Sequence, residues 1–324
     1  MFSLLVNTYC NGACPYCFAK SSMNGKQLDL SNLDLLVRVY KKYNQKVAGV
    51  FGGEPTLHPD FLDIIQKFSQ NELLPVVYSN ALMEAEILAE LAKTEIRMVL
   101  NINTRDVYSN EKYELLLKNL HVLSQTLGRK VRIGVNFYKP GQDIESILDI
   151  LKTTNFDYHV RIGLASPILD ETNSYAREED IPQLGYEIYE FIKKILARGY
   201  IPFFDCGIRL CMFNESQLED IRYDIAGSIS HSACYRMFTI FPDLTISPCI
   251  TLADYIKKLN LEETTNFKKI YQFYESTFAK YTALGNLEKC RKCHYFQKIC
   301  TGGCLSRTII NHRHVEVQEE FDFG

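Results

Sequence analysis

The chain has 324 residues, of which 46% are hydrophobic and 23% are charged, and its formal net charge is −3. This length exceeds what one hydrophobic core usually supports, so we expect two domains. The small net negative charge gives no sign of the basic surface that binds nucleic acid or an anionic membrane. The sequence also has no apolar run of about 18 residues that could span a bilayer.

Strand and helix patterns alternate regularly over the first 200 residues. Short apolar runs predict strands over residues 2–8, 47–51, 74–78, 96–100, 131–137 and 158–164. Apolar residues spaced i, i+3, i+4 and i+7 predict helices over residues 33–40, 61–68, 83–93, 113–123, 144–151 and 184–195. Six successive strand–helix units imply a parallel sheet covered by helices. The spacing alone leaves an open sheet and a partial barrel both possible.

The first expected strand leads into three closely spaced cysteines, Cys10, Cys14 and Cys17, in a C-x3-C-x2-C pattern. Thiols this close together indicate metal binding or redox chemistry rather than packing. A closed zinc site or a complete [4Fe–4S] cluster takes four protein ligands, and the next cysteine is Cys206. The loop therefore indicates a cluster with one iron open to a non-protein ligand. A zinc site completed by a distant residue is the alternative.

Glycine and polar residues lie at or near the ends of the next four expected strands. They are Gly52-Gly53-Glu54 after the second strand, Ser79 and Asn80 after the third, Asn101 and Asn103 after the fourth, and Asn136 within the fifth. Parallel α/β folds place their sites at the carboxyl ends of strands. We therefore expect these residues to gather around the cysteine loop.

The cysteine spacing, with Tyr16 directly before Cys17, resembles the signature of the radical S-adenosylmethionine (AdoMet) superfamily. The resemblance implies a (β/α)6 partial barrel and a [4Fe–4S] cluster whose open iron binds the amino and carboxylate groups of AdoMet. It also implies a low-potential electron donor such as flavodoxin or ferredoxin. Reductive cleavage of AdoMet then gives a 5′-deoxyadenosyl radical, which removes a hydrogen atom from the substrate.

Gly52-Gly53-Glu54 resembles the GGE motif of this family, in which backbone and carboxylate hold the methionine ammonium of AdoMet. Glycine lets the backbone approach a ligand closely, and a carboxylate accepts a charge-assisted hydrogen bond from an ammonium. Tyr16 matches the aromatic position beside the adenine. Asn101 matches a ribose-contacting position that is often serine, and Ser79 is a further candidate contact. The alternatives are a Gly-Gly turn, a core tyrosine and a polar cap at a strand end.

Beyond about residue 200 we expect the strand–helix alternation to stop. Eight cysteines follow, enough for two sets of four: Cys206, Cys211, Cys234, Cys249, Cys290, Cys293, Cys300 and Cys304. This region resembles the SPASM extension of radical AdoMet enzymes, which carries two auxiliary [4Fe–4S] clusters. We therefore expect a partial-barrel core over residues 1–200, a connecting segment over 201–230 and a SPASM-like domain over 231–324.

Three features depart from the SPASM pattern. The spacing between Cys293 and Cys300 is one residue longer than usual, Leu244 stands where glycine is common, and no cysteine follows Cys304. By resemblance, Cys304 joins Cys234 and Cys249. Either Cys206 or Cys211 completes that set, and the other completes the set of Cys290, Cys293 and Cys300. If one of the two is not a ligand, it becomes a candidate hydrogen-atom donor.

The same region allows two other interpretations. The run Cys290-Arg291-Lys292-Cys293-His294 matches the attachment pattern of c-type haem, and paired C-x2-C motifs also bind structural zinc. The N-terminus lacks the basic segment of a signal peptide, and the chain is too long for a small disulfide-stapled domain. We therefore expect a cytoplasmic protein whose cysteines remain reduced, which argues against haem attachment.

The resemblance implies a peptide or protein substrate, because SPASM-bearing relatives mostly crosslink, epimerise or oxidise peptides. The first strand lies almost at the start of the chain, so we expect no preceding peptide-recognition domain, which weakens this interpretation. The alternative is a dehydrogenase or epimerase acting on a sugar, nucleoside or amino acid. A non-enzymatic iron–sulfur or zinc protein is the third possibility, against which the AdoMet-type motifs argue. No general base can be named from the sequence.

Overall fold

The computed structural model describes residues 2–224, 234, 237–256, 258–261 and 266–313. The strands are β1 (Phe2–Leu5), β2 (Val47–Phe51), β3 (Leu74–Ser79), β4 (Arg97–Asn101), β5 (Val131–Phe137), β6 (His159–Leu164), β7 (Ile201–Phe204), β8 (Phe238–Ile240), β9 (Thr245–Ser247) and β10 (Leu259–Asn260). They form one sheet in the order β10-β9-β8-β1-β2-β3-β4-β5-β6-β7. Strands β1 to β7 pair in parallel, and the sequence predicts the first six of them.

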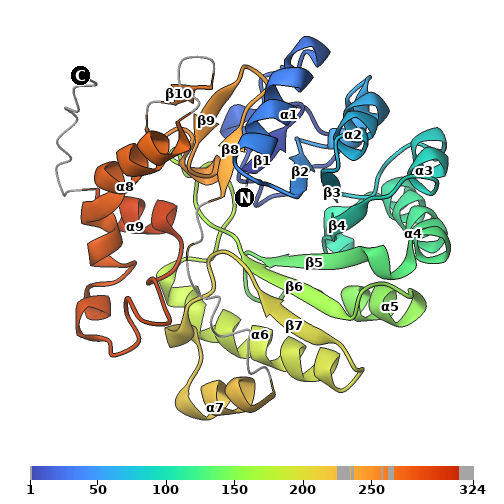
Figure 1. The fold of residues 1–324 in the computed structure, drawn as a ribbon. Coiled ribbons are helices and arrows are strands. Elements are labelled where there is room, and N and C mark those ends of the chain that lie inside the picture. Colours follow the sequence, from blue (N-terminus) through green and yellow to red (C-terminus); the bar gives the residue numbers. More distant parts are fainter. Residues whose placement is uncertain (1, 225–233, 235–236, 257, 262–265, 314–324) are drawn as a thin grey trace.

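Helices follow the strands and cover the sheet (Figure 1). They are α1 (Leu33–Lys42), α2 (Phe61–Gln70), α3 (Ala85–Leu91), α4 (Asn110–Thr126), α5 (Glu145–Thr153), α6 (Ile181–Leu196), α7 (Glu215–Asp224), α8 (Phe267–Leu284) and α9 (Leu305–Asn311). The α/β fold class is confirmed. No helix in the described part of the chain is long and apolar enough to cross a membrane.

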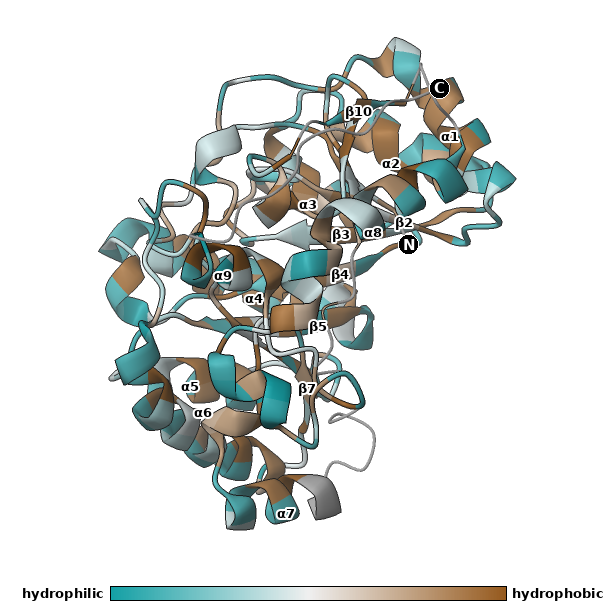
Figure 2. Cartoon of the chain, turned by 90° about the vertical axis from the view of Figure 1, so that its left-hand side faces the viewer, coloured by the Kyte–Doolittle hydropathy of each residue, from teal (hydrophilic) through white to brown (hydrophobic). Residues whose placement is uncertain are grey.

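The core forms where helix stripes meet the sheet. In α2, Phe61, Ile64, Ile65 and Phe68 recur at helical spacing, and each is at most 1% exposed. Along β3, β5 and β6 buried apolar residues recur at alternate positions and pack under the helices, whereas Arg132, Asn136 and Arg161 are only half-buried. Figure 2 shows the resulting pattern, with brown apolar and teal polar segments alternating along the helices.

The expectation that strand–helix alternation stops near residue 200 is wrong. Strand β7 pairs in parallel with β6, and helix α7 follows it. The sheet also continues on its other side, because β8 pairs in parallel with β1, with Phe2 opposite Phe238. One sheet therefore runs through residues on both sides of the predicted boundaries. The division at residues 200 and 230 stays a prediction.

Candidate functional site

The cysteine loop leaves β1 and runs directly beside the turn that follows β2. The backbone N–H of Gly53 donates to Asn7 O at 3.1 Å, and that of Glu54 donates to Tyr9 O at 2.9 Å. In the opposite direction, Asn7 Nδ2 donates to the backbone carbonyl of Glu54 at 2.8 Å. The two segments that the sequence singled out are therefore joined by three hydrogen bonds.

Both glycines of the turn are required by this close approach. A Cβ on Gly52 would lie 2.2 Å from Asn7 Oδ1, and a Cβ on Gly53 would lie 2.2 Å from Tyr9 O. A side chain at Gly53 would displace the Tyr9 backbone that enters the cysteine loop, and one at Gly52 would displace the Asn7 side chain that holds the turn. The glycines thus have a structural role whether or not a ligand also approaches them.

Amide donors point at two of the three loop sulfurs. Cys10 Sγ accepts from the backbone N–H of Gly12 at 3.2 Å and from Asn80 Nδ2 at 3.7 Å. Cys14 Sγ accepts from Asn103 Nδ2 at 3.1 Å. Amide hydrogen bonds to cysteine sulfur are among the features that tune an iron–sulfur cluster. The donor set therefore fits a cluster bound by Cys10, Cys14 and Cys17.

Cys10 is exposed and Cys14 and Cys17 are half-buried. Partial desolvation by the surrounding loop raises the pKa of the Cys10 thiol to about 11 and also raises the pKa values of Cys14 and Cys17. Metal binding removes these protons, because only the thiolate is a ligand. Among the residues the structure describes, no three Cys, His, Asp or Glu side chains are grouped to hold a single metal ion. A cluster places each thiolate on a different iron, so its ligands do not converge on one point.

Glu54 is 1% exposed, and its carboxylate is held by donors from two strand ends. Oε1 accepts from Thr56 Oγ1 at 2.7 Å, from Thr56 N at 3.3 Å and from Ser79 Oγ at 2.9 Å. Oε2 accepts from the backbone N–H of Asn80 at 2.7 Å. Burial raises the pKa of Glu54, while these hydrogen bonds partly counter that rise.

This arrangement refines the roles predicted for Glu54 and Ser79. The Ser79 hydroxyl donates to Glu54 and accepts from Ala81 N at 3.0 Å. Its donor and one of its acceptor positions are therefore already used within the protein. A carboxylate oxygen has about two acceptor positions. Oε1 of Glu54 therefore has no position left, whereas Oε2 has one.

Tyr16 lies next to the loop sulfurs but inside the protein, at 6% exposure. Its ring packs on Tyr138 with 5.2 Å between centroids, and its hydroxyl donates to Asn103 Oδ1. Burial and the neighbouring Cys14 thiol raise the pKa of Tyr16 well above its usual range, which keeps this donor protonated. Asn103, which the sequence placed only at a strand end, thus connects Cys14 to Tyr16.

Asn101 lies apart from these contacts and belongs to a polar cluster formed by the end of β4, the middle of β6 and the residue that follows β7. Its Oδ1 accepts from Arg161 Nη1 at 2.8 Å, and Arg161 also forms an ion pair with Asp205. The sequence interpretation missed Arg161 and Asp205. A charged residue within the apolar run of β6, and a carboxylate directly before Cys206, were the available signals.

The C-terminal cysteines gather around helices α8 and α9. Cys234 N donates to Thr301 Oγ1 at 2.8 Å, and Gly302 N donates to Cys300 Sγ at 3.4 Å. Cys290, Cys300 and Cys304 are buried, whereas Cys206 and Cys211 reach the surface. Sets of four thiols here would suit auxiliary clusters.

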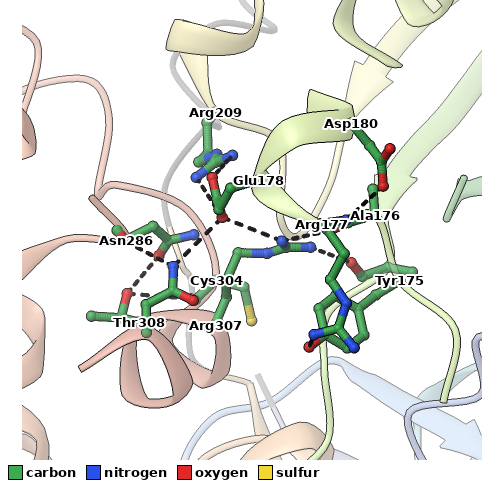
Figure 3. Close-up of polar contacts among 12 residues, drawn as sticks. Tyr175, Ala176, Arg177, Glu178, Asp180, Arg209, Asn286, Cys304, Arg307 and Thr308 are labelled. Atoms are coloured by element: carbon green, nitrogen blue, oxygen red, sulfur yellow. Dashed lines mark hydrogen bonds and ion pairs between the residues drawn. The ribbon is translucent and has the colours of Figure 1, made fainter. Parts of the chain in front are cut away.

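A network of two arginines and a glutamate lies beside Cys304 (Figure 3). Arg209 Nη2 is 2.9 Å from Glu178 Oε2, and Arg307 Nη1 is 3.4 Å from Glu178 Oε1. The side chains of Arg209 and Arg307 are only 1% and 4% exposed. Two buried cations therefore share one carboxylate, and the network carries a net positive charge. The sequence interpretation did not find it.

Comparisons with known proteins agree with this arrangement. The family model described as the radical SAM superfamily, named after S-adenosylmethionine, matches residues 4–222. The tungsten-containing aldehyde ferredoxin oxidoreductase cofactor-modifying protein of Pyrococcus furiosus is 25% identical over 263 residues, covering 72% of this chain and 70% of that protein. A probable GTP 3′,8-cyclase of Methanococcus vannielii is 20% identical over 213 residues, covering 62% and 69%.

Two solved structures share the fold over nearly the whole chain. Streptococcus suis SuiB bound to its precursor peptide SuiA has a TM-score of 0.66 at 19% identity and covers 99% of this chain and 74% of SuiB. Native anSMEcpe with bound AdoMet and the Cp18Cys peptide has a TM-score of 0.66 at 15% identity and covers 94% and 88%. The family model matches more than half of this chain, so the chain belongs to the radical SAM superfamily.

Proposed function

We propose that this radical SAM enzyme modifies a peptide, and that Cys10, Cys14 and Cys17 hold its AdoMet-binding [4Fe–4S] cluster. The observation that carries the proposal is the junction of two segments at the carboxyl ends of β1 and β2. There the cysteine loop is hydrogen-bonded to Gly53 and Glu54. Sites in parallel α/β folds lie at this end of the strands.

When bound, the cluster and AdoMet supply an electron and a 5′-deoxyadenosyl radical that removes a hydrogen atom from the substrate. The chain positions these groups. Asn80 and Asn103 direct amide N–H groups at the sulfurs of Cys10 and Cys14. The remaining acceptor position on Glu54 Oε2 suits the ammonium of AdoMet, and Thr56, Ser79 and Asn80 orient that carboxylate.

Tyr16, Ser79 and Asn101 stay proposed contacts of AdoMet. Tyr16 and Ser79 are already engaged within the protein, so any role toward AdoMet includes shaping the pocket wall. Asn101 is held by Arg161, which leaves its Nδ2 donors for a ribose hydroxyl. A low-potential protein such as flavodoxin or ferredoxin is the proposed electron donor.

A peptide substrate is supported by the fold that the chain shares with SuiB and anSMEcpe, both solved with peptides bound. Its cysteine-rich C-terminal region is consistent with the SPASM-type extension. The relatives described as GTP 3′,8-cyclases support the second candidate, a reaction on a small molecule. The two candidates differ in the size of the product and are separated by mass spectrometry.

The test uses anaerobically reconstituted protein, AdoMet and a chemical reductant. We expect release of 5′-deoxyadenosine, which the triple variant Cys10→Ala/Cys14→Ala/Cys17→Ala abolishes. Undiminished cleavage in that variant overturns the assignment of the loop. Adding peptides or nucleotides separately, and searching for a mass change in each, decides between the two substrate classes. A mass change only with nucleotides rejects the peptide proposal.

A further inference from the structure

The loop of residues 165–176, which follows β6, is hydrogen-bonded to the cysteine loop. Ser174 N donates to Pro15 O at 2.8 Å, and Asn173 Nδ2 donates to Tyr16 O at 3.3 Å. Both acceptors lie between the second and third cysteines of the C-x3-C-x2-C pattern. The 165–176 loop is therefore bound directly to the backbone that joins two of the three thiols.

Asn173 also fixes the 165–176 loop from within. Its Nδ2 donates to Ser166 O at 2.9 Å, and its Oδ1 accepts from Ile168 N at 3.1 Å. The residue is 5% exposed, and a buried side chain whose polar groups are all paired makes its surroundings rigid. One amide thus sets both the shape of the loop and its contact with Tyr16.

A single guanidinium from α9 holds the two ends of this loop together. Arg307 Nη1 donates to Ala176 O at 2.7 Å, a contact visible in Figure 3, and Nη2 donates to Ala165 O at 3.2 Å. The planar fork of arginine can bind two acceptors at once, whereas the ammonium of lysine is a point charge. Arg307 therefore closes the loop at its base.

The base of the loop packs on Tyr16, a proposed contact of AdoMet. Ala165 forms a buried cluster with Tyr16 and Tyr138, and the Tyr175 ring packs against that cluster. Arg307 contacts both loop residues of this group, because it donates to Ala165 O and its guanidinium carbon lies 5.2 Å from the centre of the Tyr175 ring. Packed residues thus connect Arg307 to Tyr16 without a gap.

We propose that Arg307 is a positioning residue for AdoMet. By closing the 165–176 loop, it holds Tyr16 and the backbone before Cys17 in the shape that binds the cofactor. This rests on the proposed function, in which the cysteine loop forms part of the AdoMet site. It gives helix α9 of the C-terminal region a role in AdoMet binding through two backbone carbonyls of a distant loop.

The test replaces the fork with an apolar side chain of similar length. In anaerobically reconstituted protein of parental iron content, Arg307→Met should weaken AdoMet binding about ten-fold in calorimetric titration. Hydrogen exchange measured by mass spectrometry should become faster in residues 165–176 and 15–17. Arg209→Met is the matched control, because Arg209 is similarly buried but its side chain donates, among the described residues, to Glu178 alone. The control should lower Tm comparably and leave AdoMet affinity and loop exchange nearly unchanged.

A double-mutant cycle shows whether Arg307 and Asn173 act through the same loop. Asn173→Ala should also weaken AdoMet binding, and Arg307→Met/Asn173→Ala should lose much less affinity than the product of the two single losses. Independent losses overturn the inference, as does parental affinity in Arg307→Met or an equal loss in Arg209→Met. Parent protein that binds no AdoMet would overturn the proposed function itself, so the two failures are distinguishable.

Discussion

Asn103 donates its side-chain amide to the sulfur of Cys14, with 3.1 Å between Nδ2 and Sγ, across 89 residues of sequence. The same side chain accepts the hydroxyl of Tyr16 through Oδ1. Asn103 also fixes its own backbone, because its N–H donates to the Tyr108 hydroxyl at 3.0 Å. The segment after β4 is thereby held against the cysteine loop by two hydrogen bonds, and the bond to Tyr108 fixes its backbone.

Loss of the Asn103 amide should weaken the loop cluster. A hydrogen bond to a charged group contributes about 1.5–3 kcal/mol, so Asn103→Leu should lower cluster affinity roughly ten- to a hundred-fold. The Asn103 amide stabilises the reduced, more negative form of the cluster. Its loss should therefore also lower the reduction potential of the cluster. The measurements are iron retention against a chelator and an EPR-monitored redox titration.

The variant is best compared in a Tyr16→Phe background, since leucine at position 103 would otherwise leave the Tyr16 hydroxyl without its acceptor. Tyr16→Phe alone keeps the bond to Cys14 and should retain the parental potential. An unchanged potential in the double variant would show that the Asn103–Cys14 contact is only a packing contact.

Glu54→Ala should affect both AdoMet binding and folding. Loss of a charged hydrogen bond weakens binding by about ten- to a hundred-fold. The structure adds a second expectation, because Thr56, Ser79 and Asn80 would be left as buried donors without an acceptor. Each such donor costs about 1–3 kcal/mol unless water reaches it. Calorimetric titration with AdoMet and chemical denaturation measure the two effects separately.

Ser79→Ala is the matched control, since it removes one donor and keeps the carboxylate. It should lower the unfolding free energy by about 1 kcal/mol and weaken AdoMet binding much less than Glu54→Ala does, because Ser79 is a neutral contact and a support for the carboxylate. If Ser79→Ala weakens AdoMet binding as much as Glu54→Ala does, Ser79 is a direct contact and not a support for Glu54.

The strands, the helices and the cysteine loop could be predicted because their signals are local. Strands β2 and β5 have the bounds that their apolar runs predict. The pairing of β8 with β1 could not be predicted, because it joins Phe2 and Phe238 across most of the chain. The Arg209–Glu178–Arg307 network was missed for a related reason. Charged residues are usually exposed, and nothing in their spacing brings these three together.

Leu244 shows how a departure from a family pattern is accommodated. It stands where glycine is common, and its φ of +61° lies in the left-handed region that favours glycine. This conformation costs leucine about 1 kcal/mol. The side chain is 3% exposed, and burying leucine contributes about 1.5–3 kcal/mol. Burial therefore outweighs the strain, which accounts for a leucine in a glycine-type turn.

Removing the shared carboxylate should destabilise the protein. Glu178→Gln would leave Arg209 and Arg307 buried without a counter-charge. Breaking a buried pair in this way costs about 3–5 kcal/mol, but Glu178 is 34% exposed, and solvent screening reduces the expected loss to about 2 kcal/mol. Thermal unfolding should show a fall in Tm of roughly 3 °C. Glu95→Gln, at the exposed pair with Lys130, is the control and should change Tm little.

The same carboxylate makes stability depend on pH in a defined direction. Burial alone would raise the pKa of Glu178, but Arg209 and Arg307 lower it below 4.5 overall. Its stabilising contribution is therefore complete above pH 4.5 and is lost as the pH falls through the folded-state pKa. Glu178→Gln should flatten this part of the stability profile. An equally steep profile in the variant would assign the acid sensitivity to other carboxylates.

Arg209 should raise the reduction potential of an auxiliary cluster that the C-terminal cysteines are expected to hold. Its side chain is 1% exposed and packs on Gly303, next to Cys304, where a positive charge favours the reduced, more negative form of a cluster. Arg209→Gln should therefore shift at least one auxiliary cluster to lower potential. Arg209→Lys keeps the charge and loses the Nε donor, so a smaller shift is expected. EPR-monitored redox titration of the reconstituted protein measures both.

Arg177→Gln is the matched control, because Arg177 pairs with Glu171 at the surface and should leave the potentials unchanged. A purely structural role for Arg209 predicts a different result. The glutamine variant would then lose thermal stability or iron while its remaining clusters kept the parental potential. Equal shifts in the glutamine and lysine variants would identify the Nε hydrogen bond, and not the charge, as the cause. The lysine variant thus separates the two ways in which one arginine can act on a cluster.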